Sequence, residues 1–96
     1  MTPASALLLH PDDNVLVCRA RIAEGDEVLI DGRRVVSAAE IDIGHKIARR
    51  DLKAGDKIIK HGAPIGSAVA DIRIGAHVHL HNIKSDYIAT HTREAS

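Results

Sequence analysis

The sequence predicts a mostly-β domain of short strands joined by tight glycine turns, with little helix. Three observations support this prediction. Apolar residues come in short runs that alternate with polar ones, as in strands with one buried face. Glycines recur between these runs, where their freedom to adopt a positive φ closes turns. No segment sustains the 3.6-residue periodicity of an amphipathic helix.

One glycine motif occurs four times and indicates an approximate internal duplication. It consists of an aliphatic residue, two others, Gly, two others, and then Val or Ile. The copies span Ile22–Val28, Ile41–Ile47, Leu52–Ile58 and Ile72–Val78. They follow one another at a long, a short and a long interval, unlike the even period of a solenoid. Four independent tight turns, which a small β fold needs anyway, are the alternative explanation.

The first expected strand covers Asn14–Ile22. Its apolar face would hold Leu16, Cys18, Ala20 and Ile22. The arginines between them lie on the opposite face, together with Val15 and Val17, because side chains alternate along a strand. Cys18 therefore fits a small core residue better than a nucleophile. As the only cysteine, it also excludes an internal disulfide.

The clearest hairpin lies in Val28–Val36. Asp31 and Gly32 separate two apolar runs, a pattern typical of a two-residue type I′ turn. The register that follows from this turn pairs Val28 with Val35 and Ile30 with Arg33.

The remaining elements are shorter. Strands are expected at Lys57–Lys60 and His77–Asn82, and Ser37–Glu40 can form one capped helical turn. His10–Asn14 holds Pro, Asp and Asn, so a structural turn is favoured there. The C-terminal stretch Lys84–Ser96 is polar, and we expect it to be loosely ordered.

Composition excludes several classes of function. The 13 basic and 13 acidic residues give no net charge, and one Tyr is the only aromatic residue. A phosphate-tracking surface and base stacking both need more than this, so nucleic acid is not an expected partner. The absence of a secretory signal and of a long apolar stretch predicts a cytoplasmic protein that does not enter a membrane. A 96-residue domain without Phe or Trp has a thin core, which favours a partner chain or an oligomer.

Seven histidines are the most unusual feature of the sequence. Three of them form the segment His77-Val78-His79-Leu80-His81. In a strand, the two apolar residues would enter the core and the three imidazoles would share the other face. Two such imidazoles can bind one metal ion, with a third ligand from elsewhere, such as His45 or His10. A solvated or subunit-facing strand is the alternative.

Two lysine–histidine pairs are further candidates. His45 precedes Lys46, and Lys60 precedes His61. A lysine beside a histidine can bind a carboxylate or supply an acid or a base, although such pairs also occur on ordinary surfaces. Asn82 extends the polar face of the histidine segment or ends its strand.

Five short segments occur in an informative order. They are His10–Val15, Ile43–Ala48, Ile59–Gly62, Pro64–Gly66 and Gly75–Asn82. Together they resemble the N-terminal SAF domain of the altronate/galactarate dehydratase family. The resemblance runs from Leu7 to Ile83, within one domain of residues 1–96 that ends in the polar tail. Two positions depart from the family pattern and leave the substrate open: His61 replaces Tyr, and Leu80 replaces Thr.

The resemblance implies a compact β-clip (SAF-like) fold and a role in a lyase. Family members remove water from sugar acids such as altronate or galactarate. A related sulfolactate sulfo-lyase, built from a small and a large subunit, removes sulfite. The resemblance therefore implies that this chain is a separate small subunit, inactive alone, whose partner is a large lyase subunit. The alternative from another class is a non-catalytic SAF module for carbohydrate binding or assembly.

The lyase context suggests a role for each candidate residue. Catalysis is expected from His45 and Lys46. Substrate binding is expected from Lys60, His61 and Asn82. A divalent metal, iron or similar, would be shared with the large subunit and bound by His77, His79 and His81.

Overall fold

The computed structural model of the protein describes residues 6–85. Within this range it has nine strands and no helix, which confirms the predicted mostly-β fold. The strands are β1 (Ala6–Leu7), β2 (Val15–Cys18), β3 (Glu27–Ile30), β4 (Arg33–Val36), β5 (Lys46–Ala48), β6 (Lys57–Lys60), β7 (Ala63–Ala68), β8 (His77–Val78) and β9 (Ile83–Lys84). No helix of these residues is long and apolar enough to cross a membrane.

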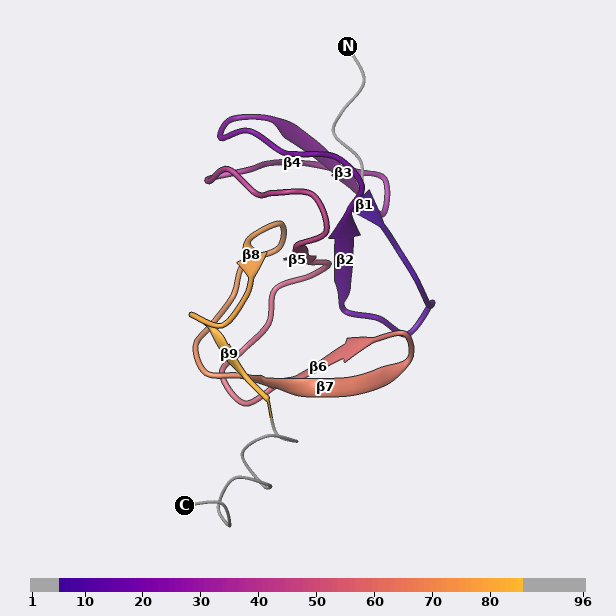
Figure 1. Ribbon diagram of the computed structural model, residues 1–96, viewed down its shortest axis with the longest axis vertical. Helices are drawn as coiled ribbons and strands as arrows, with labels where there is room; N and C mark the ends of the chain where they lie inside the picture. Colours follow the sequence, from indigo (N-terminus) through magenta and orange to yellow (C-terminus); the bar gives the residue numbers. More distant parts are fainter. Residues whose placement is uncertain (1–5, 86–96) are drawn as a thin grey trace.

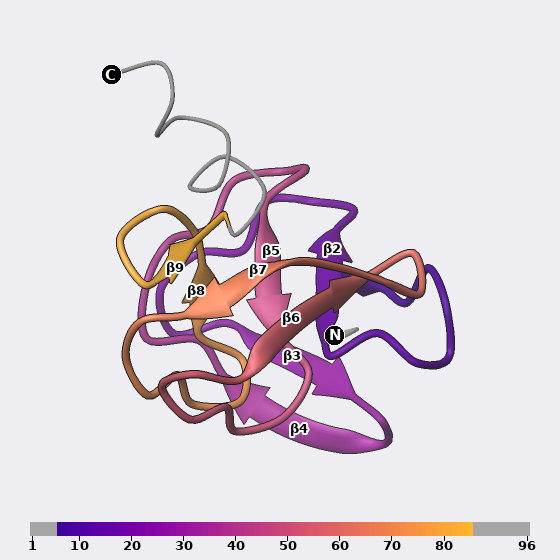
Figure 2. The ribbon, with the colours of Figure 1, turned by 90° about the horizontal axis from the view of Figure 1, so that it is seen from below.

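The strands form three small antiparallel sheets. The largest has the order β1-β2-β5-β8, the second is the β3–β4 hairpin, and the third has the order β6-β7-β9. The β3–β4 hairpin and a second hairpin, formed by β6 and β7, lie at opposite ends of the four-stranded sheet (Figure 1). Seen from below, β6 and β7 cross over β5 (Figure 2). Short crossing strands of this kind agree with the expected fold class.

The β3–β4 hairpin has the predicted turn and register. Asp31 and Gly32 both adopt positive φ, at 50° and 82°, as a type I′ turn requires. The observed pairs include Val28 with Val35 and Ile30 with Arg33.

A second hairpin, β6–β7, repeats this design. Its turn is formed by His61 and Gly62, with φ of 56° and 75°. β6 has the predicted bounds, whereas β7 was not predicted. Pro64 and Gly66, both poor strand formers, hide this strand, and the register shifts between Ile58 and Ile59 opposite it.

Hydrogen bonds of the first half recur in the second half. Gly25 donates its N–H to the carbonyl of Ser37, and Gly55 donates to that of Ala68, both at 2.8 Å. The isolated β-bridges repeat in the same way, between Ile22 and Ile41 and between Leu52 and Ile72. The four glycine motifs therefore pair as an internal duplication would pair them.

The core divides into two apolar clusters, one for each half. The first holds Val15, Ala48, Leu52, Ile58, Ala68, Ile72 and Val78. The second holds Leu16, Cys18, Ile22, Val28, Ile30, Ile41 and Ile47. Successive residues Val15 and Leu16 thus enter different clusters, because β2 runs between them and is buried on both faces. The prediction that Val15 lies on the polar face was wrong, whereas Cys18 is a core residue as expected.

Two other expectations were wrong, and a third concerns residues that lie mostly outside the described range. The helical turn at Ser37–Glu40 is absent, and the Ser37 hydroxyl instead donates to the carbonyl of Ala39. The strand expected over Asn14–Ile22 ends at Cys18. The polar tail lies outside the described residues from position 86 onward.

The turn at His10–Asn14 holds the second hairpin in place. The buried carboxylate of Asp13 accepts hydrogen bonds from the N–H groups of His61, at 3.0 Å, and Gly62, at 2.8 Å. The Asn14 amide donates a hydrogen bond to the carbonyl of Lys57 in β6 and accepts one from the N–H of Ile59, both at 2.8 Å. These contacts give the turn the structural role that was favoured.

Candidate functional site

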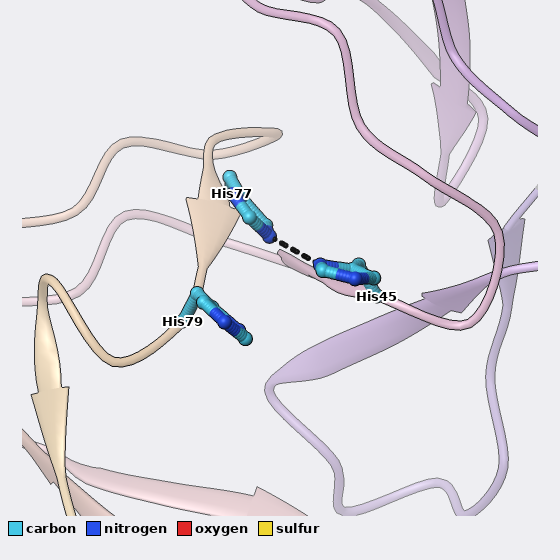
Figure 3. Close-up of side chains that lie close together, drawn as sticks. All are labelled: His45, His77 and His79. Atoms are coloured by element: carbon cyan, nitrogen blue, oxygen red, sulfur yellow. Dashed lines mark hydrogen bonds between the residues drawn. The ribbon is translucent and has the colours of Figure 1, made fainter.

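The candidate site lies where β5 and β8 pair in the central sheet. His45 precedes β5, and Lys46 is its first residue. His77 opens β8 and pairs with Ile47 across the sheet. This pairing brings together residues that are about 30 positions apart in the sequence. Figure 3 shows the result, with His77 and His79 side by side and His45 facing them.

Three imidazoles converge at this place. Nδ1 of His45 lies 2.9 Å from Nε2 of His77, and each of the three residues offers a ring nitrogen within 4.8 Å of the other two. The rings of His77 and His79 are stacked, with centroids 5.1 Å apart and planes 9° apart. His45 and His77 are half-buried, whereas His79 is exposed. The cluster therefore opens to solvent on the His79 side.

The histidine segment is not the continuous strand that was expected. β8 ends at Val78, and residues 79–82 form a turn. Leu80 consequently points to solvent with 78% of its surface exposed, instead of entering the core. His81 is exposed, and its ring lies 5.5 Å from that of His77. The converging set is thus completed by His45 in place of His81.

Asn82 closes this turn and fixes the backbone of two of the histidines. Its side-chain amide donates to the carbonyl of His77 at 2.7 Å and accepts from the N–H of His79 at 2.9 Å. Both ends of the amide are therefore engaged by the backbone. Asn82 was expected to end the strand or bind substrate, and in the structure it serves as a positioning residue for the cluster.

The surroundings of His77 disfavour its protonated form. Burial lowers the pKa of His77, and repulsion from His45, His79, His81 and Lys46 lowers it further. The hydrogen bond between His45 and His77 also requires an unprotonated nitrogen on one of the two rings. Neutral imidazole is the form that accepts a proton or a metal ion.

Lys46 lies beside the histidines, and Lys60 lies near Lys46. Burial lowers the pKa of Lys46, and repulsion from the nearby ammonium of Lys60 lowers it further. The charge of Lys46 also opposes protonation of His77. Lys60, Lys46 and His77 therefore share one electrostatic environment. Lys60 is half-buried at the end of β6.

His61, by contrast, serves the second hairpin. Its exposed side chain belongs to the β6–β7 turn, and its N–H is bound by Asp13. Gly62 lies beside the ring of His10 in the same turn. The substrate-binding role that the Lys60–His61 pair predicted for His61 therefore has no support from the positions of the described residues.

A half-open hollow of about 190 Å³ adjoins the histidines. It is lined by Ser37, Ala38, Ala39, Ile41, Gly75, Ala76, His77, His81 and Asn82. Its walls are mainly apolar, with His77 at one side. A second half-open hollow of about 450 Å³ adjoins it and shares Ala38, Gly75, Ala76 and Asn82 with it.

Comparison with known proteins identifies the domain. Residues 4–86 match the family described as the altronate/galactarate dehydratase SAF domain. This chain belongs to that family. The histidine cluster, Lys46 and Lys60 all lie inside the matched span of this SAF domain.

Curated relatives of this SAF domain include much longer enzymes. Altronate dehydratase of Escherichia coli (strain K12) is 45% identical over 78 residues, or 81% of this chain and 16% of the relative. Altronate dehydratase of Bacillus subtilis (strain 168) is 40% identical over 82 residues, again 16% of the relative. The (2R)-sulfolactate sulfo-lyase subunit alpha of Paracoccus pantotrophus is 50% identical over 52 residues, or 54% of this chain and 78% of that subunit. The chain therefore spans a small part of each dehydratase, whereas its match covers 78% of the Paracoccus subunit.

Sequence reasoning missed one residue that shapes the SAF domain site indirectly. Arg49 follows β5 and donates to the carbonyls of Pro11 and Asp13, at 2.8 and 2.9 Å, and to the carboxylate of Asp31. It thereby ties the end of β5 to the β3–β4 hairpin and to the turn at His10–Asn14. Its partners are distant in sequence, so no local motif pointed to it.

Proposed function

We propose that this SAF domain is the small component of a lyase that acts on a hydroxy acid. Its histidine–lysine face would complete an active site whose remaining walls come from a large lyase subunit. The observation that carries this proposal is the convergence of three imidazoles at a solvent-facing site beside Lys46, which itself lies near Lys60. Catalysis by the domain alone is not part of the proposal.

The relatives support both the reaction class and the division into subunits. The names of the matched proteins are altronate dehydratase and sulfolactate sulfo-lyase subunit alpha. Altronate and sulfolactate both carry a hydroxyl group beside a carboxylate. Elimination from such an acid breaks the C–H bond next to the carboxylate and expels a group from the neighbouring carbon. The substrate of this domain would share that hydroxy-carboxylate unit.

Each group at the site has a matching task. The ammonium of Lys60 would bind the carboxylate of the acid, because opposite charges attract strongly in a partly buried site. Lys46, which is half-buried and near both Lys60 and His77, would take or return the proton. The imidazoles of His45, His77 and His79 would hold the hydroxyl and carboxylate oxygens. Asn82 would keep two of these imidazoles in place.

Reconstitution with a large subunit tests the proposal. This chain is co-expressed with the candidate large lyase subunit from the same genome, and the products are separated by size exclusion. The fractions are then assayed on altronate, galactarate and sulfolactate. We expect the chains to elute together and to turn over one of these acids only as a pair. A large subunit that is fully active alone, with no co-elution, would contradict the proposal and favour a binding or assembly module.

A further inference from the structure

We propose that His45, His77 and His79 form a three-histidine site for a first-row transition-metal ion in this domain itself. The inference deepens the proposed function, because the ion would then be the group that receives the oxygens of the hydroxy acid. The ligand set differs from the one that the sequence suggested, since His45 replaces His81. It follows from the pairing of β5 with β8 and from the turn that Asn82 closes.

The distances fit such an ion. Bonds from imidazole nitrogen to Zn²⁺ are about 2.0–2.1 Å, so the nitrogens of a tetrahedral site lie ~3.4 Å apart. In this structure one pair of nitrogens is 2.9 Å apart and all three offer an atom within 4.8 Å of the others. Small ring rotations would bring the three to one centre. The hydrogen bond between His45 and His77 would be replaced by two bonds to the ion.

The chemistry of the donors fits as well. The group contains three imidazoles and, among residues 6–85, no carboxylate or thiol joins it. Imidazole ligands suit Zn²⁺, Fe²⁺, Co²⁺, Ni²⁺ and Cu²⁺, whereas Mg²⁺ and Ca²⁺ prefer oxygen. Three protein ligands with a side open to solvent are typical of catalytic sites, which keep one position for water or substrate. The exposed His79 marks that open side.

The surroundings favour fixed ligands. The Asn82 amide holds the carbonyl of His77 and the N–H of His79, which limits the movement of both ligands. Supporting contacts of this kind typically change metal affinity about 10–100-fold.

Titration of the purified full chain with Co²⁺ tests the site, because tetrahedral Co²⁺ gives strong visible absorption. We expect one Co²⁺ per chain with tetrahedral bands. His45→Ala, His77→Ala and His79→Ala should each weaken binding by at least about tenfold, since a lost ligand costs no less than a lost supporting contact. His81→Ala and His61→Asn serve as matched histidine controls and should bind as the wild type does; Asn is chosen because it tolerates the positive φ at position 61.

Two results would overturn the inference. One is the absence of stoichiometric Co²⁺ binding by a chain whose circular dichroism shows the folded state. The other is a loss of affinity in His81→Ala or His61→Asn as large as in the three ligand variants. His77→Gln, which keeps a polar side chain of similar length, replaces His77→Ala if that variant does not fold. Binding without lyase activity would contradict only the proposed function, and lyase activity without binding would contradict only the metal site.

Discussion

Nδ1 of His45 lies 2.9 Å from Nε2 of His77, although the two residues belong to different halves of an internally repeated fold. The antiparallel pairing of β5 with β8 creates this contact. His79 joins them because the chain turns directly after β8 and Asn82 fixes that turn. The candidate site thus depends on a few backbone hydrogen bonds, which can be removed one at a time.

The Asn82 amide is the first of these contacts to test. Asn82→Ala removes both hydrogen bonds, so the orientation of His77 and His79 should loosen. We expect Co²⁺ affinity to fall by about 10–100-fold, as for other residues that support metal ligands. Asn82→Asp keeps the acceptor for the His79 N–H and should lose less. Equal affinity in Asn82→Ala and wild type would show that the amide does not position the cluster.

Asp13 should make the stability of the domain depend on acid. Burial raises the pKa of its carboxyl, but the N–H groups of Gly62 and His61 and the nearby His10 outweigh this effect. The resulting pKa lies below the ordinary value of 3.8. A lowered pKa stabilises the folded state above that ordinary value, and this contribution is lost as the pH falls toward the lowered pKa.

Asp13→Asn tests this dependence. The variant should be less stable than wild type at pH 7, because a neutral amide accepts weaker hydrogen bonds than a carboxylate. The difference should shrink as the pH falls below 3.8, which urea unfolding at several pH values would measure. Asp12→Asn, at an exposed neighbouring position, is the matched control. A pH-independent difference would refute the charged role of Asp13.

Gly66 should tolerate substitution less well than Gly25. A methyl group at Gly66 would collide with the backbone carbonyl of Lys84 in β9, which cannot move aside without breaking the sheet. At Gly25, with φ of 91°, nothing lies within 4 Å, so Gly25→Ala suffers only backbone strain, about 1–2 kcal/mol. Thermal unfolding should show a larger loss in Gly66→Ala. The reverse order would contradict the β7–β9 pairing.

Cys18 should be unreactive while the domain is folded. It is 1% exposed, and burial raises the pKa of its thiol, so little thiolate is present at pH 8. Reaction with a chromogenic disulfide reagent should follow global unfolding as urea is added. Rapid reaction in native buffer would mean that the second core cluster opens locally.

Local signals carried much of the fold, and pairing over distance supplied the rest. The Asp31–Gly32 turn was predicted because this dipeptide is a strong hairpin signal. The equivalent turn at His61 and Gly62 lacks that signal, and the repeat of the glycine motifs was its only trace in the sequence. His79 was expected on the same strand as His77. In the structure the strand ends before His79, and a turn keeps His79 close to His77.

The composition of the histidine cluster lay beyond local patterns. His45 was predicted as a catalytic residue and as one possible third metal ligand, but nothing in its segment encodes the pairing of β5 with β8 that brings it to His77. Leu80 was assigned to the core by alternation, but the Asn82 amide binds the backbone of two preceding residues and ends the strand. An apolar–polar pattern does not predict that a side-chain amide will take the hydrogen bonds that a neighbouring strand would otherwise make.

The most direct test of the lyase account is the turnover number of the reconstituted complex with Lys46→Met. Lys53→Met, which changes an exposed lysine away from the cluster, is the matched control. We predict that Lys46→Met lowers kcat by about 10²–10⁴-fold, the usual contribution of a general acid or base, while the complex still assembles. Lys53→Met should retain the wild-type kcat. Wild-type turnover in Lys46→Met, or in the large subunit without this domain, would contradict the account.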